Sequence, residues 1–113
     1  MNDNLLSIRT FQTSADYADY AARWYQNLGD NPTAAQFIRR RDRLVTEVDI
    51  LWNQLFDTWA ANAGELTTRA KAVNKDLEKE IKQIEKSVQN ARNAVQALAL
   101  LDQLIDLARD VIP

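Results

Sequence analysis

Residues 65–112 read ELTTRAKAVNKDLEKEIKQIEKSVQNARNAVQALALLDQLIDLARDVI and contain neither proline nor glycine. Apolar side chains recur every three or four positions throughout, at about 3.5 residues per turn, which is the spacing of one helix face. Up to Ala91 this stripe is narrow, and charged residues fill most other positions. The pattern predicts one long helix over residues 65–112 with a coiled-coil-like first half.

From Ala94 onward a second apolar row widens the arc to roughly 160° of the helix circumference. A helix with so wide an arc needs two or more neighbours, so we predict that this part lies in a bundle interior or an oligomer interface. The candidate interface residues are apolar and follow helical spacing: Leu98, Leu101, Leu104, Ile105, Leu107, Ala108, Val111 and Ile112.

The preceding part of the chain predicts two further helices. Thr13 or Ser14 can cap a first helix over residues 14–29, and Gly29 suits its C-terminal end. Residues 1–13 fit no regular element well, so we predict an N-terminal arm that packs on the bundle or on a partner subunit.

Asn31 and Pro32 suit the start of a second helix over residues 32–63, with Asn31 as the N-cap. We expect Gly64 to end it in the left-handed conformation. Two apolar rows give this helix an arc of roughly 140°. The row at its edge is also assigned to the core: Ile38, Val45, Trp52, Phe56, Trp59 and Ala63. These elements predict an all-α fold, a three-helix bundle or helical hairpin that forms a single domain over residues 1–113.

The length of the last helix leaves two possibilities open. At 1.5 Å per residue, residues 65–112 would span about 72 Å, far more than a compact monomer with a radius of gyration near 13 Å can hold. Either the helix is continuous and a second copy covers it, or it breaks around Gln89 and Asn90, where the composition changes. The unbroken stripe favours the continuous helix and a dimer.

Composition excludes several kinds of chemistry. The 113 residues include no cysteine and no histidine and carry a formal net charge of −2. Thiolate sites and histidine-based acid–base or zinc chemistry are therefore impossible. We see no nucleophile–base arrangement or phosphate loop and predict no catalytic residue, no metal and no cofactor. The aspartates within Ala94–Ile112 argue against a membrane span, and the N-terminus resembles no signal peptide, so we expect a cytoplasmic location.

The strongest candidate for a binding site is the cluster of Arg39, Arg40, Arg41 and Arg43. Four arginines on one short stretch of helix can bind phosphate groups or an acidic protein, although helical spacing spreads them around the helix. Arg41 falls inside the apolar arc, where an unpaired guanidinium is costly. We therefore predict that Arg41 forms an ion pair with an acidic residue of another helix or subunit.

Three functions remain open at this point. The leading hypothesis is a non-enzymatic protein-interaction or scaffold module that self-associates through its helices. Its partner would be a second copy, giving a homodimer, or another helical protein. The alternative is a small inhibitor or immunity-like protein that binds a protein target. The third, disfavoured by the acidic composition, is a nucleic-acid-associated helical dimer that uses Arg39–Arg43.

Overall fold

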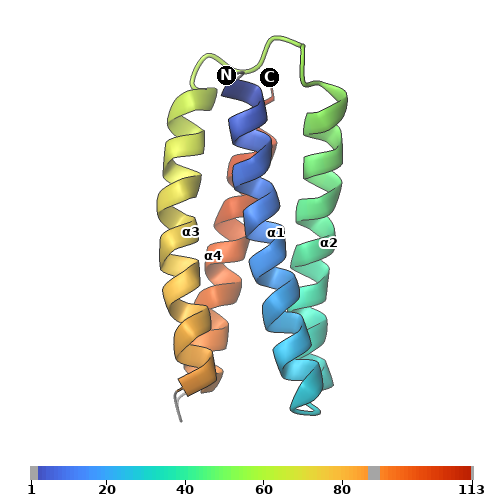
Figure 1. Ribbon diagram of the computed structural model, residues 1–113, viewed down its shortest axis with the longest axis vertical. Helices are drawn as coiled ribbons and strands as arrows, with labels where there is room; N and C mark the ends of the chain where they lie inside the picture. Colours follow the sequence, from blue (N-terminus) through green and yellow to red (C-terminus); the bar gives the residue numbers. More distant parts are fainter. Residues whose placement is uncertain (1–2, 87–89, 113) are drawn as a thin grey trace.

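The computed structural model describes residues 3–86 and 90–112, which form four helices. Each helix runs antiparallel to the one before it in the chain (Figure 1). They are α1 (Asp3–Asn27), α2 (Asn31–Asn53), α3 (Ala63–Lys86) and α4 (Asn90–Asp110). The bundle measures 45 × 21 × 20 Å, with a radius of gyration of 14.3 Å. All four helices lie roughly along its long axis, and α1 begins and α4 ends at the same end of the bundle (Figure 1). The all-α prediction is thus confirmed, with four helices in place of three.

The helices form a square in which the connection between α2 and α3 crosses the diagonal. Consecutive helices α1 and α2, and likewise α3 and α4, pack as antiparallel hairpins, and α1–α3 and α2–α4 are parallel neighbours. Helices α1 and α4 also approach one another across the diagonal, whereas no contact joins α2 to α3 within the described part of the chain. Helices α1 and α4 therefore have three helical neighbours each, and α2 and α3 have two.

The continuous helix predicted over residues 65–112 is wrong. Helix α3 ends at Lys86, α4 begins at Asn90, and the two pack side by side. The alternative break near Gln89 and Asn90 falls largely on residues 87–89, which lie outside the described residues. The wide apolar arc of the C-terminal third folds back to fill a core within one chain, because this buries the arc without a second copy.

The N-terminal arm predicted for residues 1–13 is also wrong from Asp3 onward, because α1 already begins there. Ile8 and Phe11 are fully buried in the core that all four helices share. Gly29 has φ of 78° in the turn after α1, as its predicted role in ending that helix requires. The side chain that caps α2 is Asp30, not Asn31, and it accepts from the Thr33 backbone N–H at 3.2 Å.

Helix α2 ends at Asn53, ten residues before its predicted end at residue 63. Gly64 lies in the first turn of α3 and has no positive φ. The connection over residues 54–62 is held in place by specific hydrogen bonds: Trp59 Nε1 donates to the Gln54 carbonyl at 2.8 Å, and the Ala60 N–H donates to the Val111 carbonyl at 2.9 Å. The second bond satisfies one of the free carbonyls at the C-terminal end of α4.

A polar seam fixes the register between the parallel helices α1 and α3. The Ser7 and Thr67 hydroxyls lie 2.6 Å apart, and Ser14 Oγ donates to Asn74 Oδ1 at 2.7 Å. Asn74 Nδ2 donates to the Thr10 carbonyl at 3.0 Å. All of these residues are buried. A sliding of one helix past the other would leave these buried groups unpaired, which is costly, so the seam specifies a single alignment.

Candidate protein-binding site

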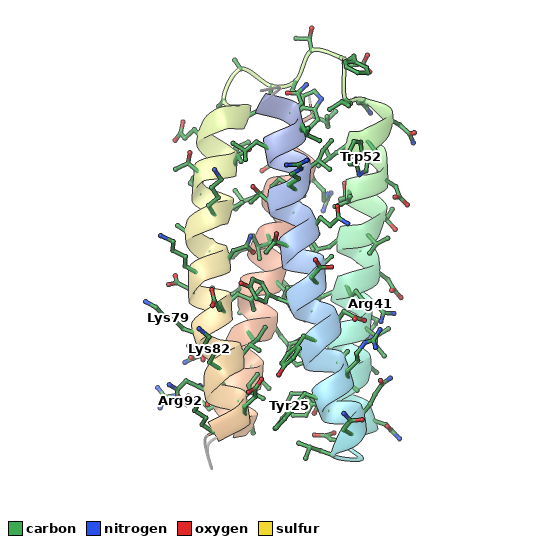
Figure 2. The ribbon with its side chains drawn as sticks, viewed as in Figure 1. Tyr25, Arg41, Trp52, Lys79, Lys82 and Arg92 are labelled. Carbon is green, nitrogen blue, oxygen red and sulfur yellow. The ribbon has the colours of Figure 1, made fainter. Side chains whose placement is uncertain are left out.

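The arginine cluster of α2 is divided between its two neighbouring helices. Arg41 is labelled on α2 in Figure 2. Its Nη1 lies 2.8 Å from Asp19 Oδ1 on α1, and its Nη2 lies 3.0 Å from Asp42 Oδ1. The predicted ion pair between Arg41 and another helix is therefore confirmed. The hydrogen bond from Arg41 holds the pKa of Asp19 below its ordinary value, and a second bond from Arg23 acts in the same direction.

Arg40 extends to the other side of α2 and bridges it to α4. Its Nε and Nη2 donate to the two carboxylate oxygens of Asp102 at 3.0 and 3.3 Å, while Nη1 donates to Gln36. Of the four arginines in the cluster, only Arg39 and Arg43 form no ion pair within residues 3–86 and 90–112. They border an open groove of about 490 Å³ that Asp102 and Asp106 also line. The groove thus presents both signs of charge, which weakens its attraction for phosphates or for an acidic protein.

The face of α4 predicted as an oligomer interface is used inside the single chain. Six of its eight residues are buried within the bundle, and the other two, Leu98 and Ile112, are partly buried against the same core. The buried six are Leu101, Leu104, Ile105, Leu107, Ala108 and Val111. Burial of this face therefore requires no second copy.

A groove between α1 and α3 carries two tyrosines whose hydroxyls are already engaged. Tyr17 donates to Glu78 Oε2 at 3.2 Å, and Tyr20 donates to Glu85. Burial, and then the charge of Glu78, raise the pKa of Tyr17. Lys82 pairs with Glu78 at 2.9 Å beside them. These side chains satisfy one another, so they form an interhelical contact of the bundle and leave few groups for a ligand.

The most exposed aromatic side chain, Phe56, lies elsewhere, just beyond the C-terminal end of α2, in an apolar row that sequence reasoning had assigned to the core. Phe56 is 89% exposed, and Trp52 and Val45 are each 45% exposed. We call Val45, Trp52 and Phe56 the α2 edge. Val45 and Trp52 are seven residues apart, so they share one face of α2, whereas Phe56 lies in the connection that follows the helix, four residues after Trp52. Trp52 is labelled near the C-terminal end of α2 in Figure 2.

The backbone around Phe56 is held firmly. Asn4 Nδ2 on α1 donates to the Leu55 carbonyl at 2.8 Å and to the Asp57 carbonyl at 3.4 Å, so the bonds flank Phe56 on both sides. The Leu55 N–H and the Asp57 N–H donate to the carbonyls of Trp52 and Gln54. An aromatic side chain on so well-anchored a backbone loses little conformational freedom when it binds a partner.

The stretch of sequence that contains the α2 edge is acidic. Residues 44–68 include four carboxylates, Glu47, Asp49, Asp57 and Glu65, and no lysine or arginine. Asp49 and Asp57 are exposed. The sequence signal that could have identified the edge is weak: the apolar arc of α2 is wider than two neighbouring helices can cover, but the number of neighbours is known only from the fold.

No family model, curated protein or solved structure is significantly similar to this chain. Among residues 3–86 and 90–112, no group of three or more acidic side chains is placed to hold a metal ion. None of the helices described is both long and apolar enough to cross a membrane.

Proposed function

We propose that the protein is a non-enzymatic protein-binding module, and that the α2 edge binds a basic amphipathic helix of a partner protein. The observation that carries the proposal is the exposure of Phe56 and Trp52 on anchored backbone. Large aromatic residues supply much of the energy of protein–protein interfaces, and soluble monomers seldom expose several of them together without a role.

The acidic character of residues 44–68 indicates the chemistry of the partner. A helix with lysine or arginine beside a leucine-rich face would place apolar side chains against Trp52 and Phe56 and cations near Asp49 and Asp57. Opposite charges around an apolar contact steer the encounter and select the partner. An acidic partner or nucleic acid would be repelled by the same surface.

Two ion pairs make the arginine-based alternatives weaker. Arg40 and Arg41 are in ion pairs with Asp102 and Asp19, so only Arg39 and Arg43 remain available for phosphates or for an acidic protein. An inhibitor or immunity-like role would be a special case of protein binding and could use the α2 edge as well. The cytoplasmic location and the absence of enzymatic activity remain predictions from the sequence.

The test is a titration of the ¹⁵N-labelled protein with a short synthetic helix of leucine and lysine, followed by amide chemical shifts. We expect shift changes at the α2 edge and an affinity that falls as salt screens the charges. Trp52→Ser and Phe56→Ser should each weaken binding by about tenfold or more. Val95→Ser, which alters an exposed apolar residue of α4 instead, is the matched control and should leave the affinity unchanged.

Two results would contradict the proposal. One is equal binding of a peptide in which glutamate replaces every lysine, since the acidic edge should reject it. The other is a set of shift changes centred on Arg39 and Arg43 that the two serine substitutions leave intact.

A further inference from the structure

All five lysines of the chain lie in one row on α3. They follow one another at intervals of three or four positions: Lys71, Lys75, Lys79, Lys82 and Lys86. At 3.6 residues per turn and 1.5 Å per residue, the row occupies an arc of about 80° and a length of about 22 Å. Every lysine in it is exposed. We call these residues the lysine row, a cationic line along the outer face of α3.

The bundle itself neutralises little of this charge. Lys82 pairs with Glu78 at 2.9 Å. Within residues 3–86 and 90–112, no other member of the lysine row takes part in an ion pair. Like charges four positions apart destabilise a helix slightly, so aligning the lysines with one another does not stabilise α3. The lysine row is therefore a candidate for contact with another molecule.

Carboxylates border the lysine row on both sides. Glu78 and Glu85 line the groove toward α1. Asp76 and Glu80 line the groove toward α4. A broad anionic surface, such as a membrane or a nucleic acid duplex, would face these carboxylates as well as the lysines and would be repelled by them. A partner that is one helix wide would meet the lysines alone, so the borders favour a narrow, linear partner.

The chemistry of the helix favours a protein over a single nucleic acid strand. Helix α3 contains no phenylalanine, tyrosine or tryptophan. Proteins that bind single strands combine cations with aromatic side chains on which the bases stack, and the lysine row provides only the cations. Carboxylates spaced three or four positions apart on a partner helix recur at the same rise as the lysines, so the two rows can face one another along their length.

We propose that the lysine row binds an acidic helix of a partner protein. This inference goes beyond the function proposed above, because it concerns another helix and a second partner of opposite charge. Helices α2 and α3 occupy opposite corners of the square and share no contact within the described part of the chain. In Figure 2, Trp52 on α2 and Lys79 on α3 are labelled on opposite sides of the view. One bundle can therefore hold a basic partner at the α2 edge and an acidic partner at the lysine row together.

The experiment is a titration of the ¹⁵N-labelled protein at low salt with a helical peptide of alanine and glutamate, which has no large apolar residue. We expect amide shift changes along α3 and none at the α2 edge, with an affinity that falls as salt screens the charges. The position of the shifts separates this binding from a response of the α2 edge to glutamate peptides, which would contradict the function proposed above.

A pair of double variants tests whether the lysine row itself is responsible. Lys75→Gln with Lys79→Gln should weaken binding of the acidic peptide about fivefold, as expected for two exposed ion pairs. The matched control is Arg39→Gln with Arg43→Gln, which removes the same charge from exposed positions of α2 and should leave the affinity within about twofold. Trp52→Ser should leave this affinity unchanged, whereas it weakens binding of the basic peptide.

Shift changes centred on Arg39 and Arg43, or equal losses of affinity in the two double variants, would overturn the inference. So would binding of duplex DNA or of phosphatidylserine vesicles that is tighter than binding of the peptide and is lost in the lysine variant. Self-association that both Trp52→Ser and the lysine variant abolish would show that the lysine row binds the α2 edge of another copy, which also overturns a separate acidic partner. Circular dichroism checks that the double variants are folded, as expected for exposed positions.

Discussion

Helices α2 and α4 both carry apolar arcs that are wide for a surface helix, yet the bundle buries one and leaves part of the other exposed. In α4 the second apolar row is largely buried, with Ala94, Ala97 and Leu104 inside the core. In α2 the corresponding outer row leaves Val45 and Trp52 almost half exposed. The difference follows from position in the square: α4 has three helical neighbours, whereas α2 has two.

An apolar arc predicts that a helix needs neighbours, but it does not predict whether the same chain or another molecule supplies them. For α4 the same chain supplies them. For α2 the bundle covers Phe37, Leu44, Val48 and Leu51 and stops short of the edge row. An apolar row that the fold does not cover is a candidate for contact with another molecule, which is why the α2 edge carries the proposed function.

The largest loss of stability should come from truncating a side chain in the buried apolar arc of α4. Leu104 on α4 is fully buried, so Leu104→Ala should lower the free energy of unfolding by about 2–5 kcal/mol through lost burial and a cavity. Urea denaturation followed by circular dichroism measures this change. A loss below about 1 kcal/mol would mean that α4 does not pack as described. The difference between a buried arc on α4 and a partly exposed arc on α2 would then not hold.

A smaller loss of stability is expected when the ion pair between Asp19 on α1 and Arg41 on α2 is removed. Arg41 and Arg23 both donate to Asp19 and lower its pKa below the ordinary value of 3.8. A lowered pKa in the folded state stabilises the fold above the unfolded-state pKa and is lost as pH falls through the folded value. Asp19→Asn should therefore cost about 0.2–1 kcal/mol near neutral pH, and this difference should shrink below about pH 4.

The comparison variant for this ion pair is Asp16→Asn, which changes an exposed carboxylate one turn earlier on α1. Asp16 takes part in no ion pair recorded within residues 3–86 and 90–112, so its substitution should alter the unfolding free energy less near neutral pH. Equal losses for the two variants would show that the Arg41–Asp19 contact contributes nothing to the packing of α2 on α1.

The smallest effect on stability should come from the residue with the most exposed aromatic ring. Phe56→Ser should change the free energy of unfolding by no more than about 0.5 kcal/mol, because an 89% exposed side chain has little burial to lose. The measurement is the same urea titration as for Leu104→Ala. A loss above about 1 kcal/mol would indicate that Phe56 packs against the protein in solution and would remove the main support for the α2 edge as a binding surface.

The α2 edge was the hardest part of the molecule to predict, because every local signal placed it in the core. Trp52 and Phe56 follow helical spacing with Ile38 and Val45, and no proline or glycine interrupts residues 53–63. The chain nevertheless leaves the helix after Asn53, where the connection is held by Asn4, from far away in the sequence. Such a contact, made across more than 50 residues, leaves no periodic trace.

The sequence by itself determined that the protein is all-helical, that Gly29 ends the first helix, and that Arg41 requires an acidic partner. These properties depend on local periodicity, on backbone freedom at one residue and on the cost of an unpaired charge, all of which can be read from neighbouring residues. Only the tertiary structure decided that residues 65–112 fold back into two helices and that α2 keeps an exposed edge. Both outcomes depend on how many neighbours each helix meets in the bundle, which a periodic pattern along one chain does not specify.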